Sequence, residues 1–463
     1  MSFSKEVSQS FPESTFKTPE DLNVLICRHE MPSNHDESSV VPSTYHKLSC
    51  PCVLANITVL GYMVVGPEGA SPEYLRRSST IALSANFCAC IVIRNEHVIN
   101  TITAAACSLP HCTPLSMREA AAQIYCHGGI HSGCAISGAI WYLVFICICF
   151  LGPQRASGMR LVLSFISGIA MLLLSAILVF SHPLLRARYH NVFELTHRLL
   201  GWAFVCMLWL QVVLAVLAES AENTGMIGQQ LLMDVPFWLL IVSTALLVYP
   251  WTQLRSIPVE AQRLSDDVTR LTFHHTGEGS CMTRRLATKP LKETHAFATV
   301  PGKDDKIYSV YISAAGDWTR RLVSNPPSKI WVKGSPVYGA TRSSRLFRKV
   351  LFVATGSGIA PVLSAVFSRL ESEIVIFWIT TQPSKKLDLE QLQRLEAYRK
   401  NIVIFNAGRD AIEPRKVSAI VYGLHREHRS EAIFVVSNPE FTGMVKADLT
   451  RCHVPVFGPI FDS

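Results

Sequence analysis

The chain has 463 residues, of which 49% are hydrophobic and 17% are charged, and its formal net charge is +8. Its mean hydropathy of +0.26 is too high for an ordinary soluble protein, and its length leaves room for two or three domains. The positive charges are spread over many short loops, which argues against a nucleic-acid partner and favours contact with lipid headgroups. We therefore expect a membrane protein with a soluble part.

Residues 1–45 are rich in Ser, Pro and Glu and predict a disordered cytosolic tail. The tail lacks the charged-then-apolar pattern of a signal peptide, so the chain is expected to insert through its internal helices. The 14 cysteines lie mostly in the apolar portion of the chain. Buried reduced thiols are expected there.

Apolar segments of helical length predict six membrane spans within a transmembrane domain over residues 46–253. A bilayer requires about 20 residues for each span, and the first segment is short for this purpose. The six predicted spans are 50–65, 80–106, 132–151, 161–181, 199–217 and 235–251.

Loop charges predict the orientation of these spans. Arg186 and Arg188 precede the fifth span and Arg255 follows the sixth, whereas the loop between these two spans holds acidic residues and no Lys or Arg. Basic loops favour the cytosolic side, so both termini are predicted to be cytosolic. Arg155 and Arg160, between the third and fourth spans, run against this orientation.

The second predicted span contains the polar sequence IVIRNEHVIN at residues 91–100. Arg94, His97 and Asn100 follow each other at intervals of three, which places them in one stripe on a helix. The stripe is expected to face protein or a cofactor. An internal ion pair of Arg94 with Glu96 and a role in binding a cofactor propionate or substrate both remain open.

Residues 190–217 begin with a charged turn and continue as an apolar helix whose first buried polar side chain is His197. An imidazole and the guanidinium of Arg198 at the mouth of a lipid-spanning helix are costly unless something binds them. The alternative is a hydrogen-bonded pair that reaches the membrane interface. The rest of the chain has to decide between these interpretations.

Short alternating segments follow Trp251 and predict a small antiparallel β-barrel over residues 254–345. From Lys349 the pattern becomes strand then helix, repeated four times, and ends on a final strand. This alternation is typical of a doubly wound parallel α/β domain, expected over residues 346–463.

The sequence ATGSGIAP at residues 354–361 lies between a predicted strand and a predicted helix. Gly356 and Gly358 would let backbone N–H groups approach a pyrophosphate at the helix N-terminus, with Pro361 in its first turn. A plain turn is the alternative. In the next loop, Ser384, Lys385 and Lys386 stand where an acidic residue would contact an adenosine ribose, which favours NADPH over NADH; an exposed basic loop is the alternative.

Two motifs of the predicted barrel, HAFAT at 295–299 and AAGDWTRRL at 314–322, form a candidate flavin site. The strand can set Phe297 against a flavin ring, and Gly316 can open a helix whose N–H groups, with Arg320 or Arg321, reach the flavin phosphates. The candidate flavin contacts are His295, Phe297, Thr299, Gly316, Trp318, Thr319 and Arg320.

The order of these parts resembles the ferric reductase and NADPH oxidase group of membrane flavocytochromes. The chain resembles more closely the fungal TmpA-like integral membrane flavoproteins, which also occur as membrane-anchored flavin reductase regions attached to adenylating enzymes. The shared features are IVIRNEHVIN, GGIHSGC (128–134), FELTHRLLGW (193–202), GDWTRRL and FGPIFDS (457–463). The resemblance covers nearly everything after residue 45 and implies a ferredoxin reductase-like soluble part with FAD and NADPH as cofactors.

The resemblance also implies a haem site. In the broader group each of two b-type haems is held by one His from the third span and one from the fifth. His131 opens the third predicted span and His197 the fifth, and two odd-numbered spans run in the same direction, so both imidazoles lie at one depth on the cytosolic side. His127, His182 and His190 remain as alternative ligands or interface residues.

The outer haem of the group would need a second His 13 or 14 residues further along each helix. Val144 or Phe145 occupies these positions in the third span and Leu210 or Gln211 in the fifth. We therefore expect one b-type haem and no outer haem.

The chain also departs from the group around the flavin. Ala296 and Ala298 replace a Pro after the His and a Thr after the Phe, and Ser437 begins the segment where relatives have Cys-Gly-Pro near the nicotinamide. These departures weaken the case for hydride transfer. Phe461 is the candidate catalytic residue, because a terminal aromatic covers the flavin ring in the group; packing on the barrel is its alternative role.

The sequence therefore predicts a membrane-bound flavin oxidoreductase that passes electrons from NAD(P)H through FAD to a membrane-embedded acceptor, directly or through one b-type haem. The acceptor itself is not named by the sequence. The alternative is a non-catalytic membrane signalling or scaffold protein that retains the reductase architecture. Ala298 and Ser437 favour this alternative, whereas His131 and His197 together with the GSGIAP turn favour the enzyme.

Overall fold

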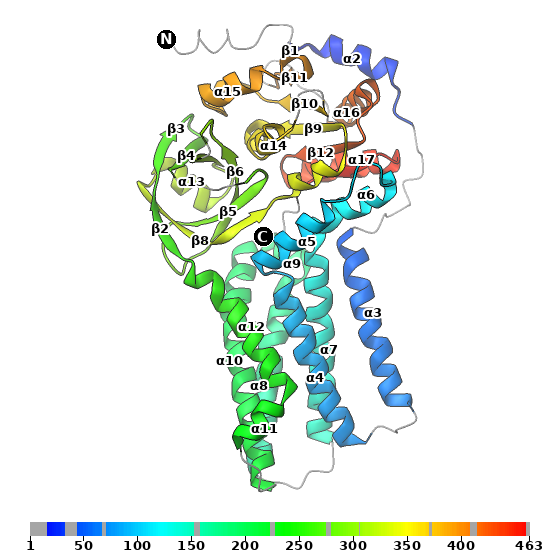
Figure 1. Cartoon of the computed structure of the whole chain (residues 1–463), viewed down its shortest axis with the longest axis vertical. Helices are drawn as coiled ribbons and strands as arrows, with labels where there is room; N and C mark the ends of the chain where they lie inside the picture. The colour runs from blue at the N-terminus through cyan, green and yellow to red at the C-terminus, as the bar shows by residue number, and fades with distance from the viewer. Residues whose placement is uncertain are drawn as a thin grey trace. The chain divides into compact units, whose positions relative to one another are not determined.

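The computed structural model describes the chain in nine stretches that form two compact units (Figure 1). The sheet unit consists of Met1–Val40, Ile99–Tyr125 and Pro250–Ser463, and the helical unit of Val41–Val98 and Cys126–Tyr249. The described residues are 16–32, 44–66, 71–151, 158–222, 227–274, 279–304, 306–369, 373–407 and 414–459.

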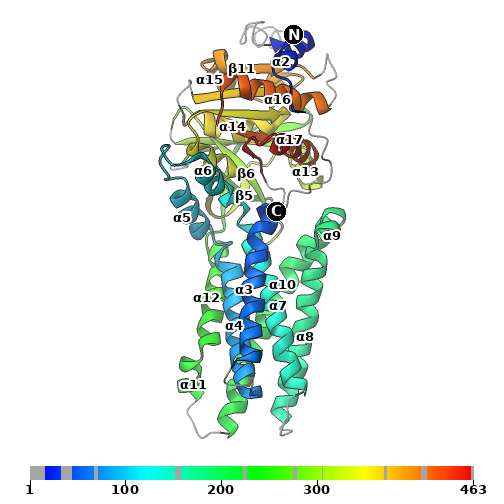
Figure 2. The same ribbon diagram turned by 90° about the vertical axis from the view of Figure 1, so that its right-hand side faces the viewer.

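Long helices that run side by side build the helical unit (Figures 1 and 2). Its helices are α3 (Thr44–Val65), α4 (Pro72–Val92), α7 (Gly128–Leu151), α8 (Gly158–Ser181), α9 (Pro183–Arg188), α10 (His190–Glu222), α11 (Ile227–Met233) and α12 (Val235–Thr252). Within the described ranges, five segments are long and apolar enough to cross a membrane. They are Tyr45–Val65, Gly128–Phe150, Leu161–Ser181, His190–Leu217 and Val235–Thr252.

The predicted second span over 80–106 is wrong as one continuous helix. Helix α4 ends at Val92, and a new helix, α5 (Glu96–Ala106), begins after a turn. The turn forms because the Asn95 side-chain oxygen accepts hydrogen bonds from the backbone N–H groups of His97 at 3.0 Å and Val98 at 3.4 Å, which caps a new helix. Five helices rather than six therefore qualify as spans.

The polar stripe predicted within that span is divided between the two units. His97 belongs to the helical unit, where its Nε2 lies 2.9 Å from the Tyr249 hydroxyl. Asn100 belongs to the sheet unit. Its amide donates to the carbonyl of Pro336 at 2.8 Å and its carbonyl accepts from the backbone N–H of Tyr338 at 3.0 Å. Asn100 thus extends the hydrogen bonding of a barrel strand.

The GGIHSGC motif has a packing role in the helical unit. A Cβ atom at Gly129 would lie 2.3 Å from the Tyr45 carbonyl oxygen, and one at Gly133 would lie 2.7 Å from that of Ser49. Two small residues four positions apart therefore let α3 and α7 approach closely, as in membrane helix pairs. The motif holds His131, between the two glycines, in a fixed position on α7.

The predicted antiparallel barrel is confirmed as a curled seven-stranded sheet with the order β2-β8-β5-β6-β7-β4-β3. Only Val259 separates β2 from β3, so one extended segment pairs with β8 and with β4 and closes the curl. The strands are β2 (Arg255–Pro258), β3 (Glu260–Arg263), β4 (Val268–His274), β5 (Met282–Ala287), β6 (His295–Pro301), β7 (Ile307–Ser313) and β8 (Lys329–Tyr338).

The predicted doubly wound domain is also confirmed. Its strands are all parallel in the order β1-β11-β10-β9-β12-β13, and the order reverses between β9 and β12. Such a reversal opens a crevice at the carboxyl ends of the strands, where ligands bind in this class of sheet. The strands are β9 (Val350–Thr355), β10 (Ile374–Ile379), β11 (Ile402–Phe405), β12 (Ala432–Val436) and β13 (Val456–Phe457). The main helices are α14 (Ile359–Val366), α15 (Leu389–Glu396), α16 (Pro414–His428) and α17 (Pro439–Arg451).

The prediction of a disordered tail over 1–45 is wrong for part of that range. Strand β1 (Phe16–Lys17) pairs with the edge strand β11, and helix α2 (Pro19–Arg28) follows it. Leu22 and Leu25 are only 3% and 7% exposed. They anchor α2 on α16, where a Cβ atom at Gly423 would lie 2.8 Å from the Leu25 side chain. The short apolar run of the tail is thus part of the core.

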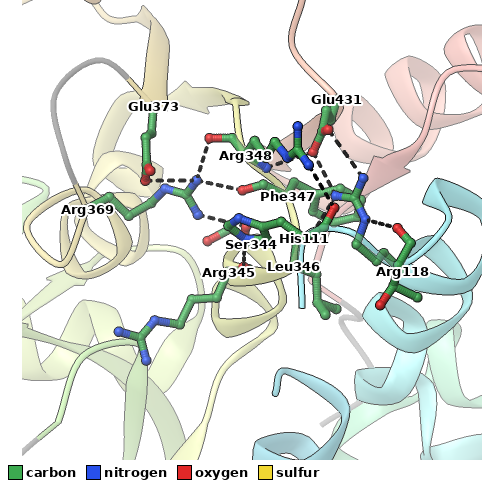
Figure 3. Close-up of polar contacts among 11 residues, drawn as sticks. His111, Arg118, Ser344, Arg345, Leu346, Phe347, Arg348, Arg369, Glu373 and Glu431 are labelled. Atoms are coloured by element: carbon green, nitrogen blue, oxygen red, sulfur yellow. Dashed lines mark hydrogen bonds and ion pairs between the residues drawn. The ribbon is translucent and has the colours of Figure 1, made fainter. Parts of the chain in front are cut away.

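The segment Ile99–Tyr125 packs on the sheet unit through helix α6 (Leu115–Ala122). Arg118 is 4% exposed and forms an ion pair with Glu431 at 2.7 Å. The same guanidinium donates to the carbonyls of Leu346 at 2.8 Å and Thr113 at 2.9 Å (Figure 3). An ion pair between the buried Arg118 and the half-buried Glu431 therefore fastens α6 to the start of β12.

Candidate functional site

The glycine-rich turn lies at the carboxyl end of β9, beside the crevice. Gly356 has a φ of +52°, a backbone conformation that favours glycine. A Cβ atom at Gly358 would lie 2.4 Å from the carbonyl oxygen of Val436 on β12. Pro361 stands in the first turn of α14, where a backbone N–H has no partner inside the helix. The turn thus presents the N-terminal N–H groups of α14 at the switch point of the sheet.

Hydroxyl groups from three strand ends meet at this turn. The Ser437 Oγ after β12 lies 2.5 Å from the Thr355 Oγ1 at the end of β9. The Ser313 hydroxyl, at the end of barrel strand β7, is hydrogen-bonded to that of Ser357 within the turn. The end of barrel strand β7 and the carboxyl edge of the parallel sheet therefore meet at groups that can both donate and accept hydrogen bonds.

The basic loop after β10 is only partly available to a ligand. Lys386 forms an ion pair with Asp267 of the barrel, and the carbonyl of Lys385 accepts a hydrogen bond from the Ser265 hydroxyl at 2.9 Å. The Lys385 side chain is exposed and Ser384 is half-buried. Of the three residues predicted to read a nucleotide phosphate, Lys386 thus has a structural partner, and Ser384 and Lys385 remain candidates.

The structure brings three predicted flavin contacts together as an aromatic cluster. On β6, the His295 ring lies 4.6 Å from the Trp318 ring, and the Phe297 ring lies 5.8 Å from it at an angle of 25°. Trp318 is 8% exposed, and its buried Nε1 has no hydrogen-bond partner among the described residues. Thr299 follows on the same side of β6 but is a core residue, because it is 1% exposed and its hydroxyl donates to the Met282 carbonyl.

Helix α13 (Asp317–Ser324) begins at Gly316, as the motif predicted. The Gly316 N–H donates to the Thr319 hydroxyl at 2.9 Å, and this hydroxyl donates to the Gly316 carbonyl at 3.0 Å. Thr319 therefore holds the turn. The side chain of Arg320 is 62% exposed and 3.9 Å from Asp317, and a Cβ atom at Gly316 would meet nothing within 4 Å. The turn is open to an approaching group.

The rings of His131 and His197 lie near each other in the helical unit, where His131 is half-buried and His197 is exposed. Their ring centroids are 6.2 Å apart, with an angle of 58° between the rings. They are the fourth residue of α7 and the eighth of α10, and since only one span, α8, separates these helices, both run in the same direction. His131 Nδ1 lies 2.9 Å from the carbonyl oxygen of Cys90, so Nδ1 donates. The Cys90 sulfur lies 3.0 Å from Nδ1 and 3.9 Å from Nε2.

Other predicted ligands are placed differently. The His190 ring packs against Phe193, with centroids 6.3 Å apart. His182 precedes α9 as its N-cap residue. In the described part of the chain, no group of three or more His, Cys, Asp or Glu side chains is arranged to hold a metal ion. Phe461, the candidate catalytic residue, lies outside the described residues.

Comparison with known proteins finds similarity to adenylate-forming reductases over most of the chain. Residues 340–463 match the family described as the C-terminal domain of adenylate-forming reductase 03009. The chain is 31% identical over 421 residues to adenylate-forming reductase 03009 of Coprinopsis cinerea, a match that covers 91% of this chain and 40% of the relative. It is 33% identical over 380 residues to adenylate-forming reductase 06235 of the same fungus, which covers 81% and 36%.

The chain thus spans about two fifths of the length of the curated relatives that it matches. Both relatives are called adenylate-forming reductases. Their names agree with the part of the sequence resemblance that concerns flavin reductase regions attached to adenylating enzymes. The ferric reductase and TmpA-like groupings stay predictions.

Solved structures with some similarity include flavoproteins. Flavohemoglobin from Malassezia yamatoensis with bound FAD and haem has a TM-score of 0.37 and 12% identity, over 89% of this chain and 98% of that one. Ferredoxin NADP+ reductase from Neisseria gonorrhoeae with bound FAD and NADP has a TM-score of 0.35 and 14% identity, over 44% and 97%. Because these scores are low, the fold assignment rests on the strand orders described above.

The close approach of Gly358 to β12 can be tested by substitution. Gly358→Ala is expected to destabilise the sheet unit by about 2 kcal/mol, because the new methyl group overpacks against backbone that has to move. Gly443→Ala in α17 is the matched control, since a Cβ atom there meets nothing within 4 Å. Thermal unfolding of the full chain in detergent measures both. Equal melting temperatures for the two variants would contradict this account of Gly358.

Proposed function

We propose that the chain is a membrane-bound flavin oxidoreductase that uses NADPH and FAD and passes electrons to an acceptor in the membrane through one b-type haem. The observation that carries this proposal is the Gly356–Gly358 turn at the switch point of the parallel sheet, joined by the Ser313 hydroxyl to the end of a barrel strand. The names of the relatives, adenylate-forming reductases, support a redox activity.

The crevice residues fit a dinucleotide. The N–H groups around Gly356 and Gly358 would hold the pyrophosphate, and the close contact of Gly358 with β12 keeps side-chain atoms out of its way. Ser384 and the exposed Lys385 would contact the phosphate that distinguishes NADPH. Thr355 and Ser437 would orient the nicotinamide amide through their paired hydroxyls.

The barrel residues fit a flavin. The buried Nε1 of Trp318 has no partner within the described part of the chain, so it is a donor that a flavin oxygen would satisfy. Phe297 and His295 would flank the ring system, and the exposed Arg320 at the open turn of Gly316 would contact its phosphates. When bound, the nicotinamide supplies a hydride and the flavin converts this electron pair into single electrons.

His131 and His197 would hold the iron of one haem through their imidazoles, whose ring centroids are 6.2 Å apart. The carbonyl of Cys90 fixes His131 in the tautomer that presents Nε2. When bound, a b-type haem carries one electron at a time.

The exposed apolar surface of the helical unit fits a lipid bilayer. Leu54 and Tyr62 on α3 are 62% and 71% exposed, and Leu161 and Leu172 on α8 are 73% and 72% exposed. Large apolar side chains in such numbers require an apolar surrounding. The chain would therefore be a multi-pass integral membrane protein, and the cytosolic placement of both termini remains a prediction.

An absorption spectrum tests the proposed function. The full chain, purified in detergent, is expected to show flavin absorbance that bleaches when NADPH is added, together with a shift of a haem Soret band. NADH serves as the matched control and is expected to act more slowly. If no chromophore is bound, the enzyme proposal fails, and the non-catalytic scaffold becomes the better account of Ala298 and Ser437.

A further inference from the structure

The half of the helical unit away from the histidine pair is filled by protein. Phe145 and Gln211 each follow a member of that pair by 14 positions, which is about 21 Å along a helix. Phe145 is 2% exposed and Gln211 is 7% exposed. Tyr142, one turn before Phe145, is fully buried and stacks on it, with ring centroids 6.1 Å apart. These residues form the packed core of the unit.

Helices α7 and α10 touch directly at this level. The Tyr142 hydroxyl donates a hydrogen bond to the side-chain oxygen of Gln211 at 2.8 Å. At the level of His131 and His197, by contrast, the two rings stand 6.2 Å apart. A flat macrocycle fits between separated imidazoles but not between two side chains in hydrogen-bond contact. The outer haem of the broader group, which the sequence predicted to be absent from this chain, therefore has no place between these side chains.

A second set of polar side chains in this part of the bundle is also fully engaged. The Asn56 side-chain oxygen accepts hydrogen bonds from the Asn86 amide at 2.7 Å and the Trp141 indole at 2.8 Å. The Asn56 amide donates to the Cys52 carbonyl at 2.8 Å and the Asn86 amide to the Ala82 carbonyl at 2.9 Å. These groups join α3, α4 and α7 and satisfy one another, as polar groups in a membrane must. These side chains therefore leave no polar group that could bind a second electron carrier.

We infer that electron delivery is one-sided: the acceptor is reduced at the membrane face where α7 and α10 begin, and no electron crosses to the other face. This inference rests on the proposed function. Helix α12 is the next span after α10, so its C-terminal end lies at that same face, and strand β2 begins at Arg255, three residues after Thr252. The exposed side of His197 makes the pair reachable from the bundle surface.

The acceptor is therefore a one-electron acceptor that approaches from the donor's side. The reaction balances as NADPH and two oxidised acceptors giving NADP⁺, one proton and two reduced acceptors. The hydride supplies both electrons, and its proton is released at the same face. Because no charge crosses the bilayer, turnover should generate no membrane potential.

Proteoliposomes test this inference. Only molecules with the sheet unit outward respond to NADPH added outside. Cytochrome c, which does not cross bilayers, is supplied outside in one sample and trapped inside in another. We expect the trapped pool to be reduced at least about tenfold more slowly, because about 20 Å of protein without a carrier separates it from the histidine pair. A lipid-soluble quinone, added as the positive control, should restore reduction of the trapped pool.

A second donor keeps the test independent of the NADPH reaction. Dithionite added outside should reduce any bound haem while trapped cytochrome c stays oxidised, and haem content should not exceed one per chain. Comparable reduction of the trapped and external pools, with either donor, or two haems per chain, would overturn one-sided delivery. If NADPH reduces neither pool, while external dithionite reduces the bound haem but not the trapped pool, NADPH is overturned as the donor of the proposed function and one-sided delivery stands.

Discussion

His197→Ala is expected to abolish the b-type haem spectrum completely and to leave the flavin content unchanged. The two sites belong to different compact units, so the loss of an imidazole on α10 does not touch the barrel residues that would hold the flavin. One remaining imidazole, on His131, cannot form the six-coordinate haem of a b-type centre. The Soret band of the reduced protein measures haem, and flavin fluorescence after denaturation measures FAD.

His190→Ala is the matched control for this experiment. His190 is the first residue of the same helix, α10, but its ring packs against Phe193 rather than against His131. That variant should keep the full haem spectrum, and His131→Ala should lose it as His197→Ala does. A full spectrum in the His197→Ala variant would show that the ligands lie elsewhere, with His127 and His182 the next to test.

The parallel sheet was predictable because its strands are continuous apolar runs. VLFVAT was expected as a strand, and β9 covers the same six residues, 350–355, all but the last of them buried. The alternating segments that predicted the barrel, 257–264, 268–274, 294–300, 306–313 and 329–334, did not include β5, because Arg284 and Arg285 interrupt its apolar pattern. Arg284 is nevertheless buried, since it donates to the Gly334 carbonyl at 3.2 Å and sits at a bulge between β5 and β8.

Errors in the helical part came from local chemistry that hydropathy does not register. The run over 80–106 is apolar enough to suggest one helix, but a single Asn95 side chain caps a second helix and divides the run. In the tail, Leu22 and Leu25 are apolar residues of the sequence, but the sequence does not show what they pack against. The segment is ordered because these two leucines pack on the apolar face of α16.

The candidate site was predictable where local motifs define it and not where distant segments meet. Gly356, Gly358 and Gly316 stand at turns whose backbone requirements are local, so their motifs identified them. The pairing of Ser313 with Ser357 joins two domains through residues that carry no signal in the sequence. The same is true of Arg118 and Glu431, which are 313 residues apart.

Glu431→Gln is expected to destabilise the sheet unit by about 3 kcal/mol at neutral pH, because it leaves the buried Arg118 guanidinium without its counter-charge. The carboxylate also accepts the backbone N–H of Arg348 at 2.7 Å, so both of its oxygens are engaged (Figure 3). For a unit of this size the melting temperature should fall by roughly 6–12 °C. Thermal unfolding of the full chain in detergent measures it.

The matched control is Glu373→Gln. Glu373 lies 3.5 Å from Arg369, but its side chain is 36% exposed. Arg369 keeps three carbonyl acceptors, those of Ser344, Phe347 and Arg348, at 2.8, 2.8 and 3.2 Å. Loss of this exposed partner should cost less than about 1 kcal/mol. The two arginines are equally buried, so equal losses would show that the shorter contact of Arg118 with both oxygens of Glu431 does not set the strength of that pair.

The contribution of Glu431 should also depend on pH. Burial raises the pKa of the Glu431 carboxyl, but the hydrogen bonds from Arg118 and from the Arg348 backbone lower it further, and the net pKa is below its ordinary value. A carboxyl whose pKa is depressed on folding stabilises the protein above its unfolded pKa of about 4.3 and loses this contribution as the pH falls through the folded value. The difference in the free energy of unfolding between the wild type and Glu431→Gln should therefore have its full value at pH 7 and become smaller below about pH 4. A difference in the free energy of unfolding that stays constant over this pH range would mean that the charge of Glu431 does not contribute to holding α6 against β12.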